Sequence, residues 1–302
     1  MKNCYSRSGL CRVEAMDQSR KKLILDTSGI NALADDPERT VILPGVLSAY
    51  LVGVTETAVS EIAANSDEAR RIRLLGIVER LLKFGMCVIP FHVIIESQAK
   101  AYLANRDAYV WRSVNVRFPE AEGEVVRQEI IHEVSEQTRE ALRQWDKDFR
   151  AIFSNAKPAF QKLFEGRSGE RPSLQAVTER LLGEGGAHRD IAVNLFERGT
   201  GTRLSQAEVQ DFTERCLPFK ALLVALCQYD RCIRDERQES LGKAGRLDMF
   251  SAVYLPYCKV FVTNDDGQCK ALRSVAEMIG RDMDVLMYSE FKDSLFGLTA
   301  AE

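Results

Sequence analysis

Two short apolar segments, far apart in the chain, each lead directly into an acidic residue. The segment at 23–25 is followed by Asp26, and the segment at 260–264 is followed by Asp265. Segments this short are typical of buried strands, and strands that alternate with helices form parallel sheets. Ligands of such sheets bind outside the carboxyl ends of the strands. The sequence therefore predicts an α/β fold that brings carboxylates together at one edge of a parallel sheet.

The same alternation continues at both ends of the chain. A parallel sheet of about five strands is predicted, with strands at 23–26, 51–54, 87–90, 259–263 and 285–288. The helices expected between them lie around residue 30, around Glu61, and over 67–84, 92–105, 248–257 and 267–279.

The middle of the chain, residues 106–245, has a different pattern. It is charged and mostly helical, with no convincing strand. We therefore predict a flexible tail at 1–20, an α/β domain formed by 21–105 and 246–302, and an all-helical insertion subdomain at 106–245. Replacing 107–243 with a short Gly/Ser linker should leave a soluble α/β core, because the core elements do not depend on the insertion for sheet pairing. The helices expected in the insertion cover 122–153, Ser173 to Leu182, a stretch from a capping box at Ser205, and 219–237 after a break at Pro218.

Composition narrows the class of protein. The 302 residues are 45% hydrophobic, which is ordinary for a globular chain with a full core, and the formal net charge is −3. Bulk charge therefore does not favour nucleic-acid binding, which would need a local basic patch. No apolar run approaches the roughly 20 residues of a membrane helix. Eight cysteines occur without a C-x-x-C pair, which indicates buried reduced thiols, and we expect a cytoplasmic protein with no membrane partner.

Four acids stand where apolar segments meet helices or loops: Asp26, Glu61, Asp248 and Asp265. Each alone is better explained as a helix cap or a surface charge. Gathered at one edge they would repel, since two unit charges about 5 Å apart cost roughly 3 kcal/mol at an effective dielectric constant of about 20. Hard oxygen ligands of this type suit Mg²⁺ or Mn²⁺. The combination therefore predicts a divalent metal site.

The residues around these acids resemble a known family. The segments Leu23–Ser28, Val59–Ile62, Leu247–Asp248 with Ala252, and Phe261–Asp265 are similar to the motifs of PIN-domain nucleases, in the same order. The resemblance covers 21–105 and 246–292 and implies a PIN-like three-layer α/β/α sandwich. The large insertion departs from the compact toxin-type members of that family. The resemblance also implies a metal-dependent endoribonuclease, either a toxin of a toxin–antitoxin pair or an RNA-processing enzyme.

The resemblance assigns roles to individual residues. Asp26 and Asp265 would anchor Mg²⁺ or Mn²⁺, Asp248 would share it, and Glu61 would orient water or hold a second ion. The supporting residues expected near them are Ser28 and Thr263, which would donate hydrogen bonds to the carboxylates, and Asp266, either a fifth ligand or a favourable charge at a helix start. The basic residues that would contact phosphates, unless they only form solvated helix faces, are Arg70, Arg71, Arg73, Lys270 and Arg273.

The substrate implied is RNA, with DNA not excluded. Two alternatives stay open. In one, the core is a catalytically weak scaffold whose insertion binds a protein partner or inhibitor, or a nucleic acid. In the other, Asp26 is the nucleophile of a phosphatase-like enzyme, although Ser28 stands where such enzymes usually carry a second Asp.

Overall fold

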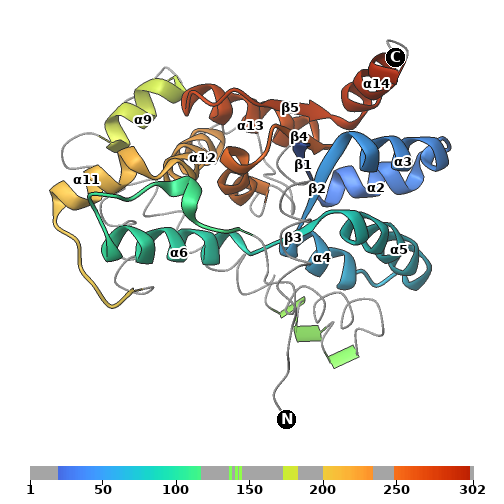
Figure 1. The fold of residues 1–302 in the computed structure, drawn as a ribbon, viewed down its shortest axis with the longest axis horizontal. Coiled ribbons are helices and arrows are strands. Elements are labelled where there is room, and N and C mark those ends of the chain that lie inside the picture. Colours follow the sequence, from blue (N-terminus) through green and yellow to red (C-terminus); the bar gives the residue numbers. More distant parts are fainter. Residues whose placement is uncertain are drawn as a thin grey trace, which may run out of the picture.

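The computed structural model describes residues 20–116, 136–137, 140–141, 143–144, 173–182, 200–233 and 248–299. Within these residues five strands form one parallel sheet in the order β3-β2-β1-β4-β5 (Figure 1). The predicted parallel sheet is therefore confirmed, and each strand lies where the sequence indicates it. The strands are β1 (Lys21–Leu25), β2 (Tyr50–Thr55), β3 (Met86–Val88), β4 (Val260–Thr263) and β5 (Asp284–Met287).

The strand order places a topological switch point between β1 and β4. The chain runs outward from β1 through β2 to β3 on one side, and β4 and β5 occupy the other side. Leu25 at the end of β1 pairs with Val262 near the end of β4. A crevice outside the strand ends at such a point is the usual ligand site of open parallel sheets. Asp26 and Asp265 follow the two strands that flank this switch point.

Helices cover both faces of the sheet, which gives three layers (Figure 1). Leu23 and Leu25 of β1 point into one core cluster, while Ile24 between them joins the other, because successive side chains of a strand alternate faces. The first face carries α2 (Thr27–Asp35), α3 (Arg39–Ala49), α4 (Glu56–Ala63), α5 (Glu68–Phe84) and α14 (Tyr288–Thr299). The second carries α6 (Phe91–Ala104), η1 (Trp111–Ser113), α9 (Leu174–Leu182), α11 (Gln206–Arg215), α12 (Leu217–Ile233), η2 (Asp248–Tyr257) and α13 (Asp266–Met278).

Three helical elements differ from the sequence prediction. Neither α3 nor α14 was predicted, and α3 contains Pro44 and Gly45, which usually interrupt helices. The helix predicted at 248–257 is present, but it is a 3-10 helix rather than an α-helix. Pro256 lacks an amide hydrogen and so removes one α-helical hydrogen bond near its end.

Helix α12 is central to the second core cluster. Every residue from Ala221 to Cys227 is at most 7% exposed, and a helix that is apolar all round is a buried helix. It packs against η2, α13 and α9. Helices from the predicted insertion therefore share a hydrophobic core with the sheet. Whether residues 106–245 also form a subdomain stays a prediction, because most of them, including most of 122–153, lie outside the described residues.

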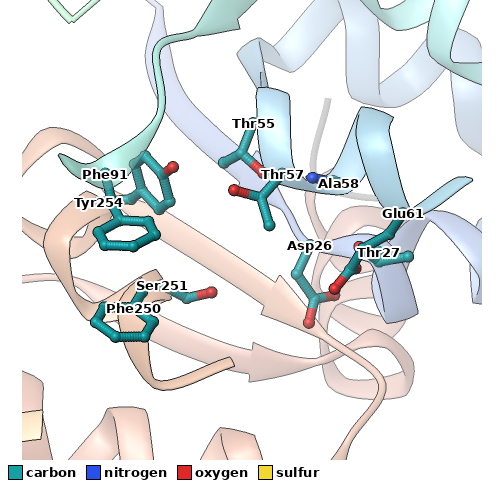
Figure 2. Close-up of a pocket in the computed structure, with 10 residues that line it drawn as sticks. All are labelled: Asp26, Thr27, Thr55, Thr57, Ala58, Glu61, Phe91, Phe250, Ser251 and Tyr254. Atoms are coloured by element: carbon teal, nitrogen blue, oxygen red, sulfur yellow. Dashed lines mark hydrogen bonds between the residues drawn. The ribbon is translucent and has the colours of Figure 1, made fainter. Parts of the chain in front are cut away.

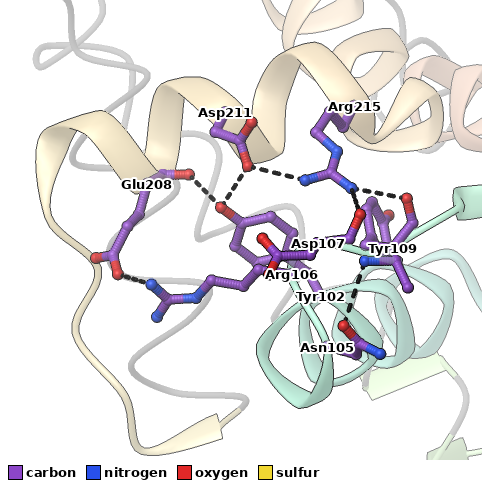
Figure 3. Close-up of polar contacts among 9 residues, drawn as sticks. Tyr102, Asn105, Arg106, Asp107, Tyr109, Glu208, Asp211 and Arg215 are labelled. Atoms are coloured by element: carbon purple, nitrogen blue, oxygen red, sulfur yellow. Dashed lines mark hydrogen bonds and ion pairs between the residues drawn. The ribbon is translucent and has the colours of Figure 1, made fainter.

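A polar clasp joins α11 to α6 (Figure 3). The Tyr102 hydroxyl donates to Asp211 Oδ2 at 2.7 Å, and Arg106 forms an ion pair with Glu208. Arg215 donates to backbone carbonyl groups in the loop after α6. The predicted capping box at Ser205 is confirmed at the start of α11, and α11 and α12 are separated just before Pro218, as expected. These contacts fix α11 against α6 and the loop that follows it.

The cysteines for which the structure describes a side chain are buried and free: Cys87, Cys216, Cys227, Cys258 and Cys269. The expectation of buried reduced thiols is confirmed at these positions. Burial raises the pKa of Cys87 and Cys258 to about 12, so these thiols stay protonated. No helix in the described ranges has both the length and the apolar character that crossing a membrane requires.

Candidate active site at the carboxyl ends of the strands

A pocket opens where β1 and β2 end (Figure 2). Asp26 and Glu61 lie on one side of it and aromatic rings on the other. The sequence prediction placed both acids at this edge, and the structure brings these two together. The lining residues are Asp26, Thr27, Thr55, Thr57, Ala58, Glu61, Phe91, Phe250, Ser251 and Tyr254.

Asp26 is held in place by the first turn of α2. It caps that helix, and its Oδ1 accepts a hydrogen bond from the Gly29 amide at 2.6 Å. Gly29 also packs tightly against β4, because a Cβ there would lie 2.8 Å from the Val262 carbonyl oxygen. The Asp26 amide in turn donates to that carbonyl group at 3.1 Å. The carboxylate is therefore fixed between β1 and β4.

Burial is the main influence on the charge of Asp26, which is 8% exposed. Burial raises the pKa of Asp26 above its usual value, and nearby Asp265 adds to the rise. Hydrogen bonds from Gly29, Thr263 and Ser28 act in the opposite direction. Burial therefore disfavours the ionised form of this carboxyl group, and a nearby cation would offset that effect.

This shift predicts how Asp26 affects stability. The folded protein holds the Asp26 proton more tightly than the unfolded chain does. The stabilisation that results is fully present at pH values below the pKa of the unfolded chain, and it is lost as the pH rises through the pKa of the folded protein. In metal-free buffer Asp26→Asn should therefore raise the melting temperature at neutral pH, by about 2–4 °C per kcal/mol removed, and not in acid. Melting curves in chelator from about pH 4 to 8 measure this. Asp35→Asn, at an exposed ion pair with Arg73, should give no increase.

The Ser28 and Thr263 side chains connect the ends of β1 and β4. The Ser28 hydroxyl donates to Asp26 at 2.9 Å and lies 2.9 Å from the Thr263 hydroxyl. It also accepts from the Asn264 amide at 2.6 Å. Thr263 accepts from the Asp265 amide at 3.1 Å and donates to Gln268. The Ser28 and Thr263 hydroxyl groups therefore link the end of β1, next to Asp26, to the end of β4, next to Asp265.

The other predicted acids are placed as follows. Glu61 on α4 is half-buried and accepts a hydrogen bond from Thr27. Asp265 caps α13 by accepting from the Gln268 amide at 2.8 Å. Asp248 begins η2, but its side chain lies outside the described part of the chain. Asp266 is exposed and pairs with Lys270 at 2.6 Å, which favours its interpretation as a charge at the helix start.

The donors fit a magnesium-type ion only in part. Among the described residues, no three carboxylate, imidazole or thiol groups lie close enough together to form a complete metal centre. Mg²⁺, however, keeps several waters and often takes only one or two carboxylates, with substrate phosphates completing its shell. The pair Asp26 and Glu61 supplies that number at one pocket. Oxygen donors of this kind are hard ligands, as Mg²⁺ and Mn²⁺ require.

The basic residues that were predicted to contact phosphates do not line the pocket. On α5, Arg70 donates to Asn31 at 3.1 Å and Arg73 pairs with Asp35 at 2.5 Å. Arg71 is buried and donates to the Asn65 carbonyl group at 2.7 Å, so it does not form the solvated face considered from the sequence. Lys270 pairs with Asp266, and Arg273 lies against β5. A phosphate-binding role for these residues stays a prediction.

Arg273 has a structural role at the edge of the sheet. The Asp284 amide donates towards β4, so Val285 and Met287 face the free edge of β5. Arg273 Nε donates to the Val285 carbonyl group at 2.8 Å and pairs with Glu290. Glu290 accepts from the Met287 amide at 2.7 Å. The ion pair thereby covers backbone groups that otherwise invite strand pairing.

We therefore expect Arg273→Ala to self-associate. The substitution exposes the edge of β5 and should also lower stability by about 1 kcal/mol. Light scattering after size-exclusion chromatography, over a range of concentrations, measures the change in mass. Lys270→Ala is the control, because its side chain is 72% exposed and touches no strand edge. Equal monomer content in both variants would contradict this role.

The sequence prediction missed the hydroxyl and aromatic groups that complete the pocket. The Phe91 and Phe250 rings stack with centroids 4.2 Å apart. Thr55, Thr57, Ser251 and Tyr254 line the pocket with them. The signal in the sequence was position, since Thr55 ends β2 and Phe91 begins α6 shortly after β3, at the same sheet edge. Comparison with protein-family models, curated proteins and solved structures gave no match.

Proposed function

We propose that the chain is a metal-dependent nuclease that hydrolyses phosphodiester bonds, with RNA as its substrate. The observation that supports this best is the pairing of Asp26 and Glu61 at one pocket beside the switch point of the sheet. Burial disfavours the ionised form of Asp26, so its carboxylate gains most from a cation. A PIN-like catalytic core is the finer description that we propose for this α/β sandwich.

Charge at the pocket supports a role for a metal. No lysine or arginine is found among the described lining residues. Carboxylates alone would repel a phosphodiester, so a bound cation is needed to bring the substrate to this edge. Mg²⁺ or Mn²⁺ would supply an activated water and neutralise charge on the phosphoryl oxygens.

In this proposal, different residues would bind the metal, orient its ligands and position the attacking water. Asp26 and Asp265 would hold the metal, and Ser28 would keep the Asp26 carboxylate oriented through its 2.9 Å hydrogen bond. Glu61, oriented by Thr27, would position water or hold a second ion. Asp248 would share the metal from η2. A 3-10 helix repeats every three residues, so position 248 falls on the same side of η2 as the pocket residue Ser251.

The alternatives find less support. Ser28 stands where phosphatase-like enzymes usually carry a second Asp, and its one hydroxyl hydrogen is directed at the Asp26 carboxylate, whose oxygens lie 2.9 and 3.1 Å from Ser28 Oγ. One observation is in favour of the scaffold alternative. Asp265 caps α13, and a cap explains the presence of this acid without a catalytic role. Residues 106–245 are also predicted to bind a protein partner or an inhibitor such as an antitoxin, and this stays a prediction.

A nuclease assay tests the proposal. The purified chain is incubated with labelled single-stranded RNA, structured RNA and DNA in Mn²⁺, in Mg²⁺ and in chelator. We expect cleavage of RNA with either metal and none in chelator. A scaffold would leave every substrate intact under all conditions, and cleavage that persists in chelator would contradict a metal-dependent site.

A further inference from the structure

The wall of the pocket opposite the carboxylates has no role in the proposed chemistry. Thr57, Ser251 and Tyr254 line it with hydroxyl groups, beside the rings of Phe91 and Phe250 (Figure 2). The pocket, including the side formed by Asp26 and Glu61, has a cavity volume of about 20 Å³. One water molecule needs roughly 10–15 Å³ of such space. A group the size of one water molecule therefore fits beside these hydroxyl groups.

Tyr254 carries a buried hydroxyl group that lacks a partner. The residue is 2% exposed, and its hydroxyl makes no hydrogen bond to any residue that the structure describes. Figure 2 shows this hydroxyl pointing towards Thr57. Thr57 and the Phe91 backbone slightly offset the burial that raises the pKa of Tyr254, but neither reaches the geometry of a hydrogen bond. An unsatisfied buried hydroxyl costs free energy, so a ligand that supplies the partner would bind favourably.

The helix that carries Tyr254 is firmly held. At one end Phe250 stacks on Phe91 of α6, with an interplanar angle of 16°. At the other end the Tyr257 hydroxyl accepts a hydrogen bond from Gln98 Nε2 at 2.6 Å. Gln98 is itself fully buried. Because η2 is fixed at both ends, Tyr254 cannot turn its hydroxyl towards solvent, and the partner has to enter the cavity.

We propose that this cavity is a subsite for a single hydroxyl group, held by Tyr254 next to Asp26 and Glu61. A hydroxyl group can accept from Tyr254 and donate to a carboxylate at the same time. No cationic side chain lines the cavity within the described residues, so a neutral group is favoured over a phosphate oxygen. The group comes either from a water molecule or from the ribose 2′-hydroxyl of RNA, which DNA lacks. This inference rests on the proposed nuclease function.

Tyr254→Phe removes the hydroxyl and keeps the ring. The matched control is Tyr288→Phe, which removes a buried hydroxyl that donates to Asp36 at 3.2 Å on the other face of the sheet. RNA cleavage should fall at least about 10-fold in Tyr254→Phe, because the bound hydroxyl loses its partner, and should change less than about twofold in the control. A set of oligonucleotides, each with one 2′-deoxy position, then identifies the source of the hydroxyl.

If the ribose supplies the hydroxyl, one 2′-deoxy position should slow the wild type about 10- to 100-fold and leave Tyr254→Phe unaffected. If water supplies it, Tyr254→Phe should slow every oligonucleotide equally and lower the melting temperature of the free protein. Wild-type cleavage rates in Tyr254→Phe would overturn the subsite while leaving the nuclease proposal intact. Absence of any cleavage by the wild type would overturn both.

Discussion

Replacing Asp26 with asparagine should reduce the rate of RNA cleavage by about 1000-fold. The amide keeps the shape of the side chain and can still accept from the Gly29 amide, so α2 retains its cap. It cannot supply the negative charge that a divalent cation needs. Asp265→Asn should cause a loss of similar size. Glu61→Gln should be milder, about 10- to 100-fold, if Glu61 only orients water.

Initial rates at saturating Mn²⁺ measure these losses, and circular dichroism shows whether each variant is folded. Asp282→Asn is the matched control, because its carboxylate is 95% exposed and pairs with Lys259. It should cleave RNA within about twofold of the wild type. Cleavage that survives Asp26→Asn would point to another site or to a contaminating nuclease.

Replacing residues 107–243 with a Gly/Ser linker should prevent folding of the remaining chain. The sequence alone led to the opposite expectation, because the strands pair without these residues. The core that α12 shares with η2 and α13 reverses that expectation, because removing α12 would expose the apolar residues that these two elements pack against it. Loss of that much apolar burial exceeds the marginal stability of a typical domain.

A single substitution tests the same dependence more gently. Phe219 on α12 is fully buried and its ring lies 5.1 Å from that of Phe212. Phe219→Ala should cost about 3–5 kcal/mol, or about 10 °C in melting temperature. Phe84→Ala on α5, where the side chain is 53% exposed, should cost less than about 1 kcal/mol. Equal melting temperatures for the two variants would show that α12 does not belong to the main core.

The sheet could be predicted because its strands are marked locally. Each is a short run of apolar residues, and Asp26 and Asp265 follow two of them as helix caps. Helix α3 could not be predicted, because Pro44 and Gly45 oppose the helix that tertiary packing of Ile42 and Val46 stabilises. The placement of α12 was also missed. Its continuous apolar run indicates a buried helix, but not what the helix packs against.

Most of the predicted site residues that the structure brings together lie at the ends of strands, while Glu61 lies on α4. Asp26, Ser28, Thr263 and Asp265 meet because β1 and β4 are neighbours, which the strand order determines. Tyr254 reaches the pocket from η2, and nothing in its local sequence indicates that position. The five basic residues were chosen by nearness in sequence, and the structure gives each an intramolecular contact instead.

Titration of the free protein with Mn²⁺, followed by calorimetry, tests the central claim most directly. Wild type should bind with an affinity that weakens as pH falls through the raised pKa of Asp26, because a protonated carboxyl group does not ligate the metal. At about 100 times the dissociation constant the ion should add roughly 2.7 kcal/mol of stability. Asp26→Asn and Asp265→Asn should lose most of the binding, while Asp282→Asn keeps it. Equal Mn²⁺ binding by all four proteins would contradict a metal site at these strand ends.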